Sequence, residues 1–133
     1  MASELRVDTL KDSSGNNSVG MAYVAEGSAK AWANLNGTGT IALRDSFNVA
    51  SVTDAATGIS QFSFSNNMSN ANYSAPYIGG NGTTNGVDDT SLLLRPVTGN
   101  IATSSYRTAF VNTAETAFVD TGNINLAIHG DLA

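Results

Sequence analysis

The chain consists of short segments in which apolar and polar residues alternate, separated by turns rich in Asn and Gly. In residues 59–65, ISQFSFS, Phe62 and Phe64 fall on one face and polar residues on the other, which predicts a half-buried strand. Residues 48–53 come just before it across a loop that ends in Gly58, so we predict a hairpin. No ten-residue stretch keeps helical apolar spacing well, and residues 109–118 are expected to form one helical turn at most.

Similar alternation predicts the remaining strands. They are residues 30–35 and 40–44, joined by the turn 36–39; residues 72–78, 90–97 and 105–112; and either 117–119 or 124–129. Pro76 makes its segment an edge strand or bends it at a bulge. Seven or eight strands in a single layer would leave an apolar face in water. We therefore predict an all-β protein with two packed sheets, an antiparallel β-sandwich or jelly roll.

The large aromatic side chains are expected to fill the space between these sheets, because their spacing within the strands suits a sandwich interior. The predicted core aromatics are Trp32, Phe47, Phe62, Phe64, Phe110 and Phe118.

Residues 1–29 differ from the rest because they hold few apolar side chains. Polar and apolar residues alternate around Leu5 and Val7, which predicts one short strand, and residues 12–17, DSSGNN, are typical of a turn. A single strand cannot bury enough surface to stand alone, so it must add to a sheet. Two interpretations stay open: an extended N-terminal assembly arm that uses Leu5, Val7 and Leu10, or an edge strand of the same domain.

Composition narrows the function classes. A chain of 133 residues suits one compact domain. Its net charge of −5 argues against nucleic acid as a partner, since phosphates require a basic surface. No apolar run approaches the length of a membrane span, and the first residues lack the order of a signal peptide. The absence of cysteine removes disulfides and thiolate metal sites.

The sequence offers little catalytic chemistry. His129 is the sole histidine, and no partner that would orient it as a general base can be identified. Asp88 and Asp89 stand beside a Gly-rich stretch that suits calcium, but adjacent residues of a strand point to opposite faces. A solvated turn explains them better. We therefore expect no catalytic residue, no metal site, no cofactor and no enzyme activity.

A binding loop is the stronger functional candidate. Residues 79–86, GGNGTTNG, are predicted to form an adaptable surface loop, in which Asn81 and Asn85 have amides that suit sugar hydroxyls. Tyr73 and Tyr77 precede it and would offer flat faces to sugar rings. The alternative is a plain connector, with both tyrosines in the core or an interface.

Two blocks of the sequence are similar to those of a known group of proteins. They are SELRVDTLKDSSGNN, residues 3–17, and KAWANLNGTGTIALRDSFNVASVTDAATGISQFSFSNNMSNANYS, residues 30–74. Together they resemble small structural proteins and fibre ends of tailed bacteriophages, especially those that infect aquatic bacteria. In that family the first block stands at the N-terminus and the second begins the distal β-domain. The resemblance implies an attachment arm in residues 1–29 and a distal domain in residues 30–133.

The resemblance also implies a function. The protein would be a short tail fibre or receptor-binding protein that attaches the particle to the host as a homotrimer. It would be assembled in the host cytoplasm and carried on the outer surface of the virion. Its partners would be other virion proteins of the tail, baseplate or capsid, and a host cell-surface glycan.

Two further interpretations stay open from the sequence. One is a capsid decoration protein, of the cement or knob type, that stabilises the phage head. The other is a stand-alone lectin-like domain that binds carbohydrate without any particle. The first differs from a fibre in where the protein sits, and the second in having no virion partner.

Overall fold

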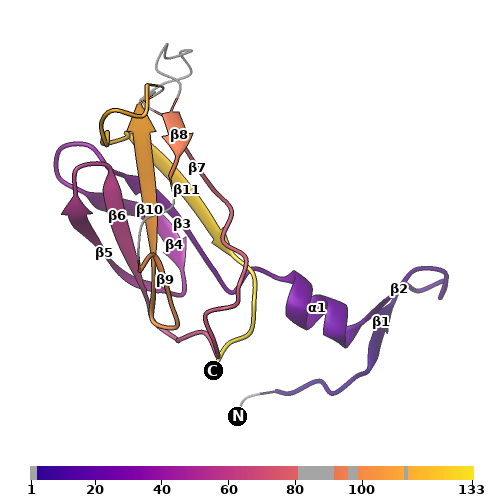
Figure 1. Ribbon diagram of the computed structural model, residues 1–133. Helices are drawn as coiled ribbons and strands as arrows, with labels where there is room; N and C mark the ends of the chain where they lie inside the picture. The colour runs from indigo at the N-terminus through magenta and orange to yellow at the C-terminus, as the bar shows by residue number, and fades with distance from the viewer. Residues whose placement is uncertain (1–2, 81–91, 96–98, 113) are drawn as a thin grey trace.

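Two antiparallel sheets pack against each other in the computed structural model, which describes residues 3–80, 92–95, 99–112 and 114–133 (Figure 1). Sheet I has the strand order β4 (Ala42–Phe47), β3 (Ala31–Asn36), β11 (Asn123–Ile128) and β7 (Tyr77–Gly80). Sheet II has the order β5 (Val49–Ala56), β6 (Ile59–Phe64), β10 (Ser105–Asn112) and β8 (Leu92–Leu94), and β9 (Ile101–Ala102) also pairs with β10. The prediction of an all-β antiparallel sandwich is confirmed.

The hairpins follow from local turn chemistry. Strands β5 and β6 pair with Val52 opposite Phe62, which confirms the hairpin predicted from alternation. Strands β3 and β4 also pair, and Gly39 in the turn between them has a φ of 65°. Glycine suits that position because a Cβ atom disfavours positive φ. The strand predicted over residues 72–78 is only partly correct, because β7 begins directly after Pro76. It lies at an edge of sheet I, one of the two positions that a neighbouring proline allows.

Pairing between distant segments joins these hairpins into sheets. Strand β10 matches the predicted segment 105–112 and lies beside β6, with Tyr106 opposite Phe62. Strand β11 is the second of the two segments predicted near the C-terminus, and it lies between β3 and β7. Phe118, in the other segment, forms only an isolated bridge with Val111.

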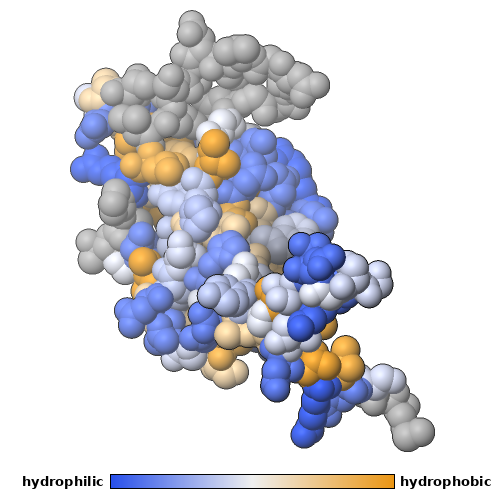
Figure 2. All heavy atoms as spheres, turned by 90° about the vertical axis from the view of Figure 1, so that its right-hand side faces the viewer, coloured by the Kyte–Doolittle hydropathy of each residue, from blue (hydrophilic) through white to orange (hydrophobic). Residues whose placement is uncertain are grey.

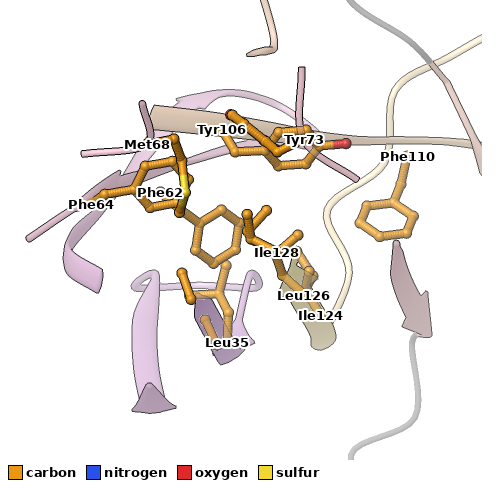
Figure 3. Packing of buried hydrophobic residues seen from close by; sticks show 12 residues of the cluster. Leu35, Phe62, Phe64, Met68, Tyr73, Tyr106, Phe110, Ile124, Leu126 and Ile128 are labelled. Atoms are coloured by element: carbon orange, nitrogen blue, oxygen red, sulfur yellow. The ribbon is translucent and has the colours of Figure 1, made fainter. Parts of the chain in front are cut away.

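The core lies between the inner faces of the two sheets (Figure 3). Sheet I contributes small and aliphatic side chains, and the facing layer contributes mostly aromatic ones. The buried cluster comprises Ala31, Ala33, Leu35, Phe62, Phe64, Met68, Tyr73, Tyr106, Phe110, Ile124, Leu126 and Ile128. Burial of this apolar surface is the main source of stability for a chain without cysteines.

The prediction that Trp32 and Phe47 belong to the core is wrong. They lie opposite each other on β3 and β4, and they are 38% and 55% exposed. The inward positions of β3 are taken by Ala31, Ala33 and Leu35, and alternation then turns Trp32 to the outer face. Of the other predicted core aromatics, Phe62, Phe64 and Phe110 are buried and Phe118 is half-buried.

The N-terminal segment, residues 3–29, forms a hairpin and a helix to one side of the sandwich (Figure 1). Strand β1 (Thr9–Lys11) pairs with β2 (Ser18–Gly20), so the prediction of a lone strand around Leu5 and Val7 is wrong. The predicted turn is confirmed: the Asp12 side chain accepts hydrogen bonds from the amide of Asn16 and the side chain of Asn17. Helix α1 (Met21–Gly27) was not predicted.

Helix α1 is short and has no side-chain cap, and none of its residues is buried. Alternation analysis misses it because seven residues do not cover two full turns of an apolar stripe. No helix within the described residues is long and apolar enough to cross a membrane.

Candidate functional site

Tyr73 and Tyr77 lie inside the sandwich and do not form a sugar platform. Tyr73 is 9% exposed, and its hydroxyl donates to the carbonyl oxygens of Ala102 at 2.9 Å and Ser105 at 3.1 Å. Tyr77 is half-buried and donates to the carbonyl oxygen of Ala109 at 3.2 Å. The expectation of open ring faces is therefore wrong for Tyr73, and the alternative reading, tyrosines in the core, describes both residues.

The two tyrosines belong to a row of edge-to-face aromatic contacts between the sheets. The ring centroids of Tyr73 and Tyr106 are 6.3 Å apart, those of Tyr106 and Tyr77 5.9 Å, and those of Tyr77 and Phe110 5.5 Å. Phe64 begins the row, 6.1 Å from Tyr73. Edge-to-face pairs at such distances add stability beyond the area that they bury.

The burial of this row raises the pKa of its phenols. Desolvation raises the pKa values of Tyr73 and Tyr77 above 10.0. For Tyr106 it raises the pKa to about 12, with a further contribution from repulsion by Tyr77 and Tyr73 when these are ionised. The folded protein therefore favours the neutral form of these phenols. Its stability falls at pH values where the phenols are ionised in the unfolded chain but still neutral in the folded protein.

Alkaline unfolding tests this row. The Tyr106 phenol ionises near pH 10.0 in the unfolded chain and near pH 12 in the folded protein. The contribution of this buried neutral phenol to folding stability is therefore complete below pH 10.0 and is lost as pH rises to about 12. We expect the melting temperature, followed by circular dichroism, to fall more steeply over that window in the wild type than in Tyr106→Phe. Equal slopes in the two proteins would contradict this account.

The other predicted binding residues, Asn81 and Asn85, lie outside the described residues. The loop was expected to begin at Gly79, but Gly79 and Gly80 belong to β7. A Cβ atom on Gly79 would stand 2.4 Å from the Phe110 ring, so this glycine allows the aromatic row to close against β7.

The residues proposed for the arm are accessible. Leu5, Val7 and Leu10 are 78%, 37% and 41% exposed. Figure 2 shows that apolar side chains are exposed on this side of the molecule, among them a group at the lower right. These side chains gain little burial within their own chain, and their role in assembly stays a prediction.

The structure describes the sole histidine of the chain but not the adjacent aspartates considered for calcium. His129 is half-buried at the end of β11, where its backbone exchanges hydrogen bonds with Ser74. No group of three or more His, Cys, Asp or Glu residues there is placed to hold a metal ion. Asp88 and Asp89 lie outside the described residues.

The outer surface of sheet I, which we call the open face, carries an apolar row that runs from β4 across β3 and β11 to Pro76, the residue before β7. Phe47 lies opposite Trp32, Trp32 lies opposite Ala127, and Ala127 donates its amide to the carbonyl oxygen of Pro76 at 3.1 Å. The two aromatic side chains lie on neighbouring strands and are both exposed. Sequence analysis missed it because both residues were assigned to the core.

A second row on the open face consists of amide side chains. Asn34 lies opposite Asn125, and its Nδ2 donates to Oδ1 of Asn125 at 2.6 Å and to Oδ1 of Asn123 at 3.0 Å. Asp45 on β4 extends the row on the other side of Asn34. On each strand this row stands two residues from the apolar row, or about 7 Å away.

Arg44 fixes the amide row from a bulge in β4. Its Nη1 donates to Oδ1 of Asn34 at 3.3 Å, to Oδ1 of Asn123 at 3.2 Å and to the carbonyl oxygen of Leu35 at 2.9 Å. Its Nη2 donates to the carbonyl oxygen of Gly122 at 2.6 Å. These bonds fix the oxygens of Asn34 and Asn123, while the Nδ2 groups of Asn123 and Asn125 make no hydrogen bond to another described residue.

The open face is hollowed where β7 meets β11. A shallow groove of about 310 Å³ lies between the two rows there. Its lining residues are Pro76, Tyr77, Ile78, Asn125, Leu126 and Ala127. Ile78, 67% exposed, forms part of one wall. This volume is at the lower end of the range for small-molecule sites.

The fold and its surface define a small antiparallel β-sandwich with an exposed aromatic and amide face. No family model, no curated protein and no solved structure matches the chain.

Proposed function

We propose that this chain is a structural protein of a phage virion, a short tail fibre or receptor-binding protein that attaches the particle to the host surface as a homotrimer. The observation that carries the proposal is the resemblance of residues 3–17 and 30–74 to phage fibre ends. The same resemblance supports placing the protein on the outer surface of the particle.

The arrangement of the chain suits this role. Residues 3–29 form a separate hairpin and helix with exposed Leu5, Val7 and Leu10, which would dock to the tail or baseplate or cross to a partner chain. Residues 31–133 contain a sandwich with its own core, which would stand outward.

Attachment would proceed through weak contacts repeated in space. Three copies per fibre and several fibres per particle raise the effective concentration of binding sites at the host surface. Weak sugar contacts then give firm adhesion, although each alone is short-lived. No reaction step is required, in keeping with a chain for which we propose no enzyme activity.

Electron microscopy of intact particles labelled with an antibody against this protein tests the proposal. We expect label at the tail or baseplate. Label spread over the head would replace the fibre by a capsid decoration protein, and particles without any label would leave the stand-alone lectin-like domain. A second antibody against the major head protein serves as the control for access of the antibody to the particle.

A further inference from the structure

We propose that the open face of sheet I is a binding site for a neutral carbohydrate, with Trp32 and Phe47 stacking on the sugar ring and Asn125 and Asn123 binding its hydroxyls. The inference deepens the proposed function, on which its biological meaning rests. It moves the glycan site away from Tyr73 and Tyr77, which lie in the core, to a different surface of the same domain.

The apolar row matches the apolar side of a sugar ring. A pyranose has faces of C–H groups and a rim of hydroxyls. Its C–H face can therefore stack on a flat aromatic surface while the hydroxyls at the rim stay hydrated or bind polar side chains. Trp32 and Phe47 lie directly opposite each other on neighbouring strands, with 38% and 55% of their surfaces exposed. Cross-strand neighbours have Cβ atoms about 5 Å apart, so both aromatic side chains extend from the same part of the open face.

The amide row is placed to bind the hydroxyl rim. Each Asn side chain has two donors on Nδ2 and an acceptor on Oδ1. The oxygens of Asn123 and Asn125 accept from Asn34 and so fix both side chains, while their Nδ2 groups make no hydrogen bond to another described residue. Asp45 adds an exposed carboxylate at the end of the row. A hydroxyl donates and accepts, so both kinds of partner suit it.

Charge favours a neutral sugar over an acidic one. The chain has a net charge of −5, and Asp45 is itself on the open face. Arg44 is the basic residue of this row, and its Nη atoms already donate to four oxygen atoms of the protein. It therefore acts as a positioning residue for the amides and has little capacity left to bind a carboxylate or phosphate.

The same features disfavour a second protein copy as the occupant. The centres of protein interfaces are depleted of charged residues. A partner protein that covered the open face would desolvate Arg44 and Asp45 together with the donors of two Asn side chains. The groove beside Ala127 has a volume at the lower end of the range for small-molecule sites.

Trp32 provides the test, because it is the only tryptophan and its indole lies at the proposed site. Its fluorescence would be titrated in the full chain with maltoheptaose, cellohexaose, an N-acetylglucosamine hexamer and a galactose oligomer. We expect a saturable change in emission and protection from quenching by acrylamide with at least one of them, at millimolar concentration.

Variants that keep Trp32 locate the site. Phe47→Ala and Asn125→Ala are each expected to weaken the sugar response at least tenfold while the protein stays folded, as checked by circular dichroism. Tyr23→Ala is the matched control, since Tyr23 is an aromatic residue of helix α1 that is 78% exposed and away from sheet I. Its sugar response should equal that of the wild type.

Three results would overturn the inference. They are no change in emission with any of the four sugars; a change that Phe47→Ala and Asn125→Ala leave intact; or a free protein whose Trp32 is already shielded from acrylamide in an oligomer that Phe47→Ala dissociates. Particle labelling separates this failure from that of the proposed function. Label at the tail without sugar binding rejects the open face alone, whereas sugar binding without label on particles rejects the virion role.

Discussion

Replacing Phe62 by alanine is expected to lower the free energy of unfolding by about 3–5 kcal/mol, as is typical when a fully buried aromatic residue is truncated. Phe62 has no exposed surface, and it lies on β6 between Val52 on one neighbouring strand and Tyr106 on the other. Its ring fills the centre of the core that both sheets share (Figure 3). Urea unfolding followed by circular dichroism measures the loss.

The matched control is Phe47→Ala, which removes the same side chain from the open face of sheet I. Phe47 is 55% exposed, so we expect a change of less than about 1 kcal/mol. Equal losses at the two positions would mean that the outer face is buried in the folded protein. A silent Phe62→Ala would contradict the packing of the two sheets.

Replacing Gly58 by alanine is expected to destabilise the protein by about 3 kcal/mol or more, through backbone strain and steric overlap together. Gly58 has a φ of 68°, and a Cβ atom there would stand 2.6 Å from the Val119 nitrogen and 2.8 Å from the Phe110 oxygen. Both are backbone atoms that cannot move aside as a side chain can. Thermal unfolding of the variant measures the effect.

Gly39→Ala separates the two causes of this loss. Gly39 has a similar φ of 65°, but its Cβ atom would meet no heavy atom of the described residues within 4 Å. We expect it to cost only the backbone strain, about 1–2 kcal/mol. If both variants lose the same amount, the close approach of Gly58 to β10 and residue 119 does not contribute.

The candidate site was harder to predict than the fold. Alternation on β3 places Trp32 on the same face as Asn34 and Asn36, so its outward position follows from the strand pattern, and its assignment to the core considered only its size. The structure buries the smaller residues Ala31 and Ala33, since the facing layer already supplies Phe62 and Phe64. The space between two packed sheets has a fixed thickness, so large side chains from one sheet fit only where the facing sheet supplies small side chains.

The sequence by itself determined the all-β class, the turn at residues 36–39 and the hairpin of residues 48–53 with 59–65, and it limited the segment that contains Pro76 to an edge or a bulge. Each follows from residues close together in the chain: turn glycines, two-residue alternation and a missing N–H donor. Only the tertiary structure decided that β11 lies between β3 and β7 and that Tyr73 closes the core. These depend on which distant segments pack together, and local patterns do not specify that choice.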